Sequence, residues 1–244
     1  VTPDLDYASS AALALNGGTI QDASFYPADL SLPAPGASGS LGANKAIVID
    51  TVQPTIAGVT SPAANAVYGT GDTIPIHVTF SEPVDVTGAP TLTLSTGLVD
   101  AVVSYSSGSG TSTLIFEYTV GGDQESLDLD YLSNAALDLA GGTIGDPLLN
   151  SAILTLPNPG ASGSLGANKA IVVDGINPAV VSVTAAPLTG FFGSGDSVSI
   201  QVVFDEPVTV TGTPHLTLET GAADAVVNYA TGSGTNTLSF SYTV

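Results

Sequence analysis

The stretch GTGDTIPIHVTFSEPV at residues 69–84 returns as GSGDSVSIQVVFDEPV at residues 193–208. In the middle of each copy, at residues 74–80 and 198–204, alternate positions are apolar, which is the period of a β-strand with one buried face. Residues 114–120 and 238–244 alternate in the same way. The apolar positions of these four segments are Ile74, Ile76, Val78, Phe80, Leu114, Phe116, Tyr118, Val120, Val198, Ile200, Val202, Phe204, Leu238, Phe240, Tyr242 and Val244. The pattern predicts an all-β protein. Within residues 51–174 it predicts one shared core made of Ile74, Ile76, Phe80, Leu92, Leu94, Leu114, Phe116 and Tyr118.

The repetition extends along the whole chain. Every matched pair of segments is separated by 124 residues, so residues 1–120 align with residues 125–244 without a gap and only GGDQ at 121–124 has no counterpart. The longest matches are PGASGSLGANKAIV at 35–48 and 159–172, and LDYASSAALALNGGTIQD at 5–22 with LDYLSNAALDLAGGTIGD at 129–146. Such self-similarity indicates tandem structural repeats.

The composition suits short strands joined by tight turns. Glycine occurs 28 times and proline 16 times, while cysteine, methionine and tryptophan are absent. Turn-forming sequences such as TGAP, SGSG and PGASGS separate the alternating segments. No segment predicts a helix convincingly, although the alanine-rich SSAALAL at residues 9–15 raises the question. The lack of cysteine excludes disulfides and thiol chemistry.

The charge excludes several classes of partner. The chain carries 22 Asp and Glu against two Lys, a formal net charge of −20. A surface of this sign repels phosphate, so we expect no nucleic acid and no anionic membrane as partners. No apolar run is long enough to span a bilayer, so we expect no membrane insertion. The acidic repeats favour an extracellular location, and an initial Val1 indicates an excerpt of a longer protein.

Three motifs carry a resemblance to a known group of proteins. An Asp-x-x-x-Pro linker occurs from Asp50 to Pro54 and from Asp174 to Pro178, and each copy has a GxGD turn and a Phe-x-Glu-Pro-Val turn. The chain resembles the tandem immunoglobulin-like and cadherin-like repeats of giant bacterial surface adhesins, including those with RTX-type calcium-binding tails. The resemblance implies β-sandwich modules on the bacterial cell surface with calcium at the domain junctions. The nonapeptide RTX repeat itself does not occur in this chain.

The linker motif predicts the domain boundaries. In the group that the chain resembles, one domain ends before the linker proline, which places boundaries near 50/51 and 174/175. Residues 1–50 would then be the C-terminal strands of a preceding repeat, 51–174 a complete repeat, and 175–244 the N-terminal strands of a following repeat. The alternative cuts at GGDQ and gives two whole units, 1–120 and 125–244.

Acidic residues that recur in turns and linkers are the candidate metal ligands. Following the strands up and down the sandwich groups Asp50, Glu82 and Asp146 at one end. It groups Asp72, Asp123, Asp128 and Asp174 at the other end, where Asp174 also approaches Glu206. Ca²⁺ prefers six to eight oxygen ligands, which loops of this kind offer; the alternative is that these carboxylates cap turns. The candidate Ca²⁺ ligands are Asp22, Asp50, Asp72, Glu82, Asp123, Asp128, Asp146, Asp174, Asp196 and Glu206.

Nothing in the sequence predicts an enzyme. The two histidines, His77 and His215, do not recur in the other copy, so no repeated Ser/His/Asp set exists. Spacing alone allows paired carboxylates for glycoside hydrolysis, but no tryptophan is available as a sugar platform. The only cations, Lys45 and Lys169, occupy the same place in GANKAIV at the expected start of a strand. They form simple ion pairs, keep a strand end in water, or form isopeptide bonds of the kind found in pilins and adhesins. We expect both lysines to be free amines, so the intact mass should equal the sequence mass.

These observations together predict a mechanical role. We expect a calcium-stiffened spacer or shaft of an extracellular bacterial adhesin or fibre, in which residues 1–50 of one copy pack head to tail against residues 175–244 of the next. The alternative is an adhesin module that binds a glycan or protein through its end loops. Small, similar loops favour the spacer, whereas a few aromatic residues that differ between the copies favour binding: Phe25, Tyr26, Phe191 and Phe192.

Overall fold

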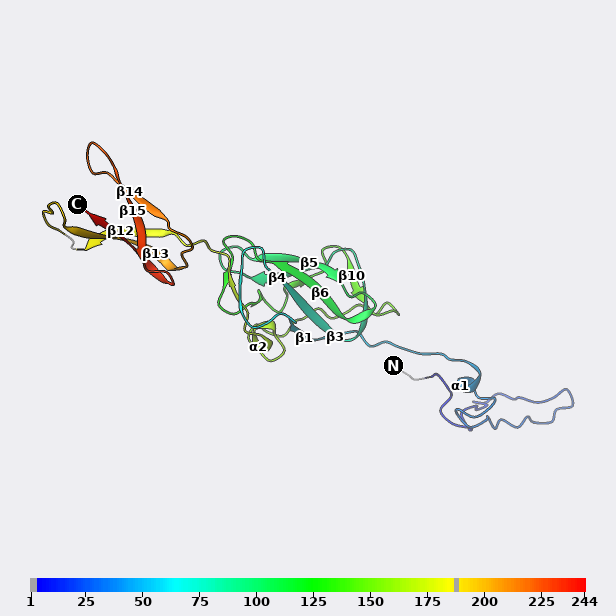
Figure 1. Cartoon of the computed structure of the whole chain (residues 1–244). Coiled ribbons are helices and arrows are strands. Elements are labelled where there is room, and N and C mark those ends of the chain that lie inside the picture. The colour runs from blue at the N-terminus through cyan, green and yellow to red at the C-terminus, as the bar shows by residue number, and fades with distance from the viewer. Residues whose placement is uncertain (1–3, 187–188) are drawn as a thin grey trace. The chain divides into compact units, whose positions relative to one another are not determined.

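The computed structural model describes residues 4–186 and 189–244. It separates into two compact units, which we call unit 1 (Val1–Val120 with Ser126–Val173) and unit 2 (Gly121–Glu125 with Asp174–Val244) (Figure 1). Antiparallel strands dominate both units, and helix in the described residues is limited to two single turns. The predicted all-β class is therefore confirmed. None of the helices in the described part of the chain has the length and apolar character needed to cross a membrane.

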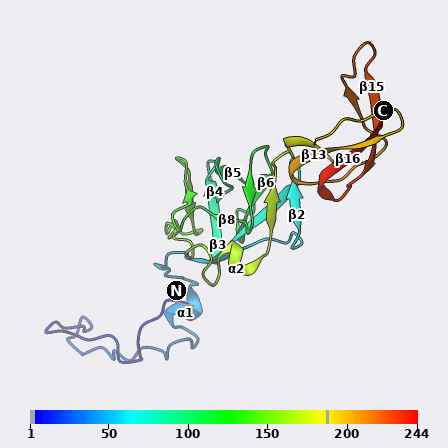
Figure 2. The same cartoon turned by 90° about the vertical axis from the view of Figure 1, so that its left-hand side faces the viewer.

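Unit 1 is built on a large antiparallel sheet. Its strand order is β1-β3-β6-β5-β4-β8, with β10 added to β3 and β9 added to β4, and Figure 2 shows β3, β4, β5 and β6 side by side. The strands are β1 (Ile56–Thr60), β3 (Thr73–Thr87), β4 (Thr91–Ser95), β5 (Ala101–Ser107), β6 (Thr111–Thr119), β8 (Asp130–Tyr131), β9 (Leu137–Asp138) and β10 (Thr143–Gly145). A second sheet of three strands has the order β2-β11-β7, with β2 (Val67–Gly69), β11 (Val172–Asp174) and β7 (Glu125–Ser126).

The alternating residues form the core of unit 1. In β3 the residues Ile74, Ile76 and Val78 are buried and the residues between them are not, as a strand with one covered face requires. The eight residues predicted from the pattern to share one core lie in a single cluster, which confirms that prediction: Ile74, Ile76, Phe80, Leu92, Leu94, Leu114, Phe116 and Tyr118.

The segment 125–173 covers this sheet with little regular structure. Its strands β8, β9 and β10 are two or three residues long and pair with β4 and β3. Buried apolar side chains from the segment complete the core, among them Leu129, Leu165 and Ile171. Backbone hydrogen bonds fix it to β1, where the Val59 N–H donates to the Gly163 carbonyl at 2.8 Å. The segment therefore supplies one wall of the core.

Each copy of LGAN forms a one-turn helix, α1 (Leu41–Asn44) and α2 (Leu165–Asn168). The preceding Ser40 and Ser164 accept a hydrogen bond from the N–H three residues later, which is an N-cap. Lys45 and Lys169 lie at the C-caps of these helices, so the expectation that they start a strand is wrong. The serine N-cap stabilises one helical turn, and the backbone becomes extended only at the lysine that follows this turn.

Unit 2 contains a five-stranded antiparallel sheet of order β12-β13-β16-β15-β14. Its strands are β12 (Val180–Ala186), β13 (Ser197–Val208), β14 (His215–Leu218), β15 (Ala225–Thr231) and β16 (Thr235–Thr243). Val198 faces Tyr242 across this sheet as Ile74 faces Tyr118 in unit 1. The buried part of the core is small and consists of Val202, Val227, Leu238 and Phe240.

Residues 4–50 differ from the prediction. We expected closing strands here, but this stretch holds only α1 and an isolated bridge between Gln21 and Pro27. The alanine-rich segment 9–15 is turn and irregular chain rather than helix. The matching strands β8, β9 and β10 exist because β4 and β3 pair with them. Residues 4–50 have no such sheet beside them, so the same sequence pattern stays irregular.

Candidate functional site

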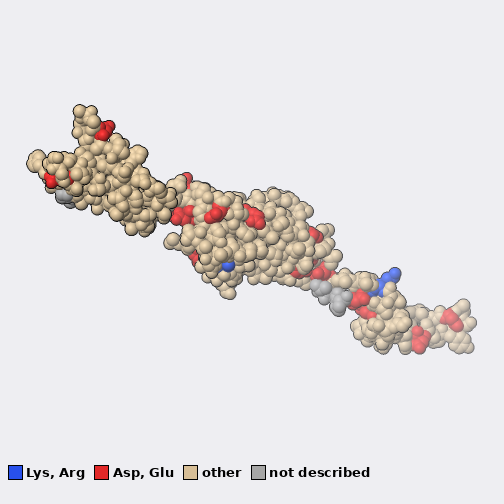
Figure 3. All heavy atoms as spheres, in the orientation of Figure 1, with Lys and Arg blue, Asp and Glu red and all other residues tan. Residues whose placement is uncertain are grey.

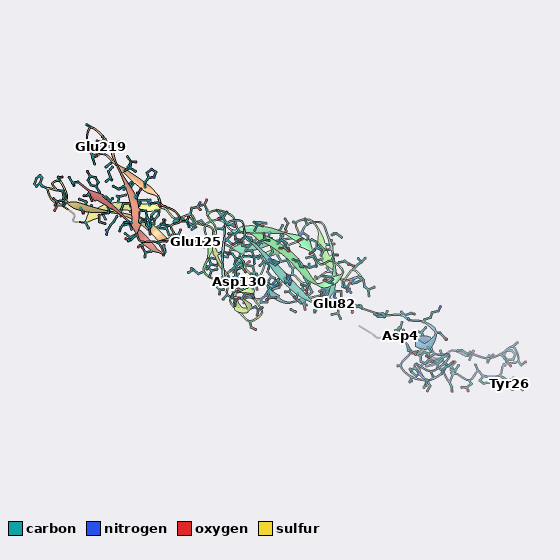
Figure 4. The ribbon with its side chains drawn as sticks, in the orientation of Figure 1. Asp4, Tyr26, Glu82, Glu125, Asp130 and Glu219 are labelled. Atoms are coloured by element: carbon teal, nitrogen blue, oxygen red, sulfur yellow. The ribbon has the colours of Figure 1, made fainter. Side chains whose placement is uncertain are left out.

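Three predicted ligands lie together in unit 1. Carboxylate oxygens of Asp50, Glu82 and Asp146 are all within 4.8 Å of one another, and no other group of three metal-ligating side chains was found among the described residues. The three carboxylates that the sequence analysis grouped thus lie together, and their role as metal ligands stays a prediction. In Figure 4 Glu82 and Asp130 lie apart along the β-rich body.

The strand geometry explains this convergence. Glu82 lies in a bulge of β3, where the register against β6 shifts between Thr79 and Val84. The Ser81 N–H donates to the Thr55 carbonyl at 2.8 Å, which holds the end of the linker beside the bulge. β10 pairs with the last residues of β3, and Asp146 follows β10 directly. The linker, the bulge of β3 and the turn after β10 thus each contribute one carboxylate to the cluster.

Asp146 is the most constrained of the three carboxylates. Its side chain is 2% exposed. Oδ1 accepts hydrogen bonds from the N–H groups of Leu148 and Asn150 at 2.9 and 2.8 Å, and Oδ2 accepts one from Asn150 Nδ2 at 2.7 Å. Burial acts to raise the pKa of Asp146, but these hydrogen bonds outweigh it and hold the pKa below its usual value. Asp146 is therefore fixed in its charged form.

Asn150 also ties the linker to this turn. Its Nδ2 donates to the backbone carbonyl of Asp50 at 3.2 Å, and the Asp50 side chain accepts from the Val52 N–H at 3.0 Å. The position of Asp50 thus depends on the Asn150 amide, which the sequence analysis did not predict. The only sequence indication was that Asn150 follows a recurrent Asp within one turn.

The donor set can be tested against Ca²⁺. Oxygens that bind Ca²⁺ lie about 2.3–2.6 Å from the ion, so ligands on opposite sides are about 5 Å apart. The separations among Asp50, Glu82 and Asp146 satisfy this limit. Three carboxylates supply at most six oxygens, and those of Asp146 already accept three hydrogen bonds. The donors fit a hard cation in type, and water or carbonyl groups would have to complete the coordination.

Other predicted ligands cap turns instead. Asp72 Oδ2 accepts a hydrogen bond from the Gly69 N–H at 2.9 Å, and Asp196 Oδ2 accepts from the Gly193 N–H at 2.7 Å. Asp22 accepts from the N–H groups of Ser24 and Tyr26 at 2.8 and 2.9 Å, which is the turn that Asp146 makes. For these carboxylates the geometry supports the turn-capping alternative.

The second predicted cluster is divided between the units. Asp72 and Asp128 belong to unit 1, whereas Asp123 and Asp174 belong to unit 2, so their convergence stays a prediction. Within unit 2, burial raises the pKa of Glu206, and repulsion from Asp174 and Asp205 raises it further. Asp174 therefore lies close enough to Glu206 for the two carboxylates to repel each other.

Asp130 is a buried acidic residue that was not among the predicted ligands. It is 9% exposed, and its carboxylate accepts hydrogen bonds from the N–H groups of Tyr131 and Gly160, both at 2.9 Å. The Tyr131 hydroxyl donates to the Pro157 carbonyl at 2.6 Å. The recurrence of LDY in both copies was the available indication. Asp130 and Tyr131 have a structural role, because their hydrogen bonds join two parts of the segment 125–173 to each other.

The surface carries charge without a basic patch. Figure 3 shows acidic side chains on both units of the chain. His77 lies on β3 and His215 on β14. Phe25 and Tyr26 are 78% and 72% exposed, and Phe191 is fully exposed. Comparisons with protein-family models, with curated proteins and with solved structures found no match to this chain.

Proposed function

We propose that the chain is part of a tandem array of immunoglobulin-like, cadherin-like β-sandwich repeats with a 124-residue period. The array acts as a non-catalytic spacer or shaft of an extracellular bacterial adhesin or fibre. The recurrence of one strand pairing at this period carries the proposal. Ile76 faces Phe116 between β3 and β6, and Ile200 faces Phe240 between β13 and β16.

Smaller features recur at the same shift. The edge-to-face contact of Tyr105 with Phe116 has a centroid distance of 6.2 Å, and that of Tyr229 with Phe240 has the same distance. The hairpin serines behave alike, since Ser109 Oγ accepts from Val86 N–H and Ser233 Oγ accepts from Val210 N–H, both at 2.9 Å. Repetition at this level of detail supports a modular array, whose length grows by adding units.

A spacer must resist extension, and force measurements test this. Several backbone hydrogen bonds between β1 and β3 must break together when unit 1 is pulled from its ends, so it should unfold in one event. Releasing about 120 residues should lengthen the tether by about 400 Å. Single-molecule force spectroscopy on the full chain measures this step. A smooth extension with no discrete event would contradict a mechanical role.

Calcium is the second element of the proposal. We propose that Asp50, Glu82 and Asp146 bind Ca²⁺ and stiffen the junction between linker and sandwich. Support comes from their separation and from the net charge of −20, which a cation would reduce. Asp174 and Glu206 are the corresponding pair in unit 2.

Thermal melting tests the calcium proposal. A ligand that binds only the folded state increases the free energy of unfolding, by about 2.7 kcal/mol when its free concentration is 100 times Kd. The melting temperature rises as a result. Unit 1 should melt at a higher temperature in millimolar Ca²⁺ than in excess chelator, and Glu82→Gln should remove most of the difference. Glu117→Gln on β6 is the control, because its side chain is exposed and outside the cluster. Coincident melts of the native chain in both buffers would exclude structural calcium.

The alternative function is recognition of a glycan or protein through end loops. It is supported by Phe25, Tyr26 and Phe191, whose exposed rings could stack on a ligand. Their loops vary between the copies, whereas the remaining loops are alike. The spacer function accounts for more of the chain, so we favour it.

A further inference from the structure

The loop at residues 121–124 connects β6 to β7 and contacts the linker that follows β11. Gly175 exchanges two main-chain hydrogen bonds with this loop. The Gly175 N–H donates to the Gln124 carbonyl at 2.8 Å, and the Asp123 N–H donates to the Gly175 carbonyl at 3.2 Å. The Gln124 side chain closes the loop on itself, because its Oε1 accepts from the Gly121 N–H at 2.8 Å. The loop and the linker are therefore joined through their backbones.

Only glycine fits at position 175. Gly175 is buried, so its main-chain N–H and carbonyl need the partners that the loop supplies. A Cβ there would collide with the Gly121 carbonyl oxygen and lie 2.9 Å from the Gln124 carbonyl oxygen, and neither backbone atom can turn away. Gly175 does not have a positive φ, so the requirement for glycine comes from the close approach of the loop.

Both ends of the loop are anchored. Before it, Val120 is 2% exposed and exchanges hydrogen bonds of 2.9 Å with the turn that precedes β3. The Val120 N–H donates to the Asp72 carbonyl, and the Val120 carbonyl accepts from the Gly71 N–H. After the loop, β7 pairs with β11, the strand that leads into the linker. The loop is therefore a fixed support for the linker.

The far end of the linker is held as well. The Ala179 N–H donates to Asp205 Oδ1 at 2.8 Å, and the Asp205 N–H donates to the Ala179 carbonyl at 3.0 Å. Residues 176–178 alone stand between Gly175 and Ala179. Pro178 has a fixed φ, and the residue before a proline is confined mainly to extended backbone. The linker therefore has few conformations left once the loop holds Gly175.

We propose that the loop 121–124 is a clasp that stiffens the linker 174–178 through backbone hydrogen bonds and without a metal ion. The two hydrogen bonds of Gly175 have to break together before the linker can leave the loop, so release is a local unfolding event of the chain. The inference rests on the proposed spacer function and names the part of the chain that limits motion of the linker.

Hydrogen exchange tests the clasp in the full chain. Gly175→Thr introduces the residue that stands at the equivalent position 51, and its side chain has no room beside the loop carbonyls. The Asp123 amide should lose at least about tenfold of its protection, because its acceptor moves away. Amides of β3 and β6 should keep their protection, which shows that unit 1 stays folded. Gly122→Ala is the control, because a Cβ on this exposed residue meets nothing within 4 Å.

Spin labels measure the stiffness of the linker. The chain has no cysteine, so Ser104→Cys on β5 and Asn228→Cys on β15, both exposed, place one label on each unit. In excess chelator the labelled native sequence and its Gly122→Ala variant should give equally narrow distributions of the distance between the labels. Gly175→Thr should broaden the distribution at least about twofold, and Gly175→Ala should broaden it less.

The outcomes separate the clasp from the proposed function. Unchanged protection of the Asp123 amide in Gly175→Thr, or equal widths of the distance distribution in all chains, would overturn the clasp. Equal broadening by Gly122→Ala and Gly175→Thr would overturn it too, since the loop would then respond to any added methyl group. A failure of the spacer function is seen elsewhere, as the absence of a discrete unfolding step under force. Gly175→Thr should keep that step, because β1 and β3 lie outside the clasp.

Discussion

Replacing Phe116 with alanine should lower the free energy of unfolding of unit 1 by about 3–5 kcal/mol. Phe116 is fully buried, faces Ile76 across β3 and β6, and meets Tyr105 edge to face at 6.2 Å. Truncation removes the ring's burial and leaves a cavity that the surrounding sheet and the segment 125–173 cannot fill. Urea unfolding, followed by hydrogen exchange so that each unit is resolved, measures the loss.

The matched substitution in unit 2 should cost less. Phe240 is 6% exposed, and Leu216 and Leu218 beside it are half-buried, so its surroundings can relax and water can enter. Phe240→Ala should lower the free energy of unfolding of unit 2 by about 2 kcal/mol. Equal losses in both units would mean that the covering segment adds nothing to the rigidity of the first core.

The main strands were predictable because apolar and polar residues alternate along them, and this alternation matches which side chains are buried. Alternation along β3 and β6 predicted both the strands and the core that they share. The covering segment was not predictable in the same way, since β8, β9 and β10 are too short to show a period. What holds them is their pairing with β4 and β3 and local side-chain caps such as Asp130. Residues 4–50 demonstrate the point, because a matching sequence without the sheet forms no such strands.

The candidate site was predictable at the level of strand direction. Tracing alternate strands up and down brought Asp50, Glu82 and Asp146 to one end, and the carboxylates do lie together there. The sequence could not indicate that Asn150 would bind both Asp146 and the Asp50 carbonyl, because an amide can satisfy many turns. Nor could it distinguish Asp72, which caps its own turn, from a carboxylate with free oxygens.

The glycines of the β5–β6 hairpin show the same limit, and they lead to the second large expected effect. The SGSG motif predicted a turn at residues 107–110 but gave its two glycines equal weight. Gly108 has φ +109°, and a Cβ there would meet the Thr113 carbonyl and the Leu114 Cα, both in the backbone of β6. Gly110 has φ +81°, and a Cβ there would have only the Asp85 carboxylate nearby, at 3.9 Å.

Gly108→Ala should therefore destabilise unit 1 by about 3 kcal/mol or more, since backbone strain of about 1–3 kcal/mol adds to an overlap of about 1–3 kcal/mol that no side-chain rotation can relieve. Gly110→Ala carries the strain alone and should cost about 1 kcal/mol. Urea unfolding of the two variants beside the native chain measures both values. Gly232 makes the same approach to Thr237 in unit 2, so Gly232→Ala should lose stability there for the same reason. Equal effects of Gly108→Ala and Gly110→Ala would show that the hairpin shifts to accept the methyl group, and that the close approach to β6 is not needed to align Tyr105 with Phe116.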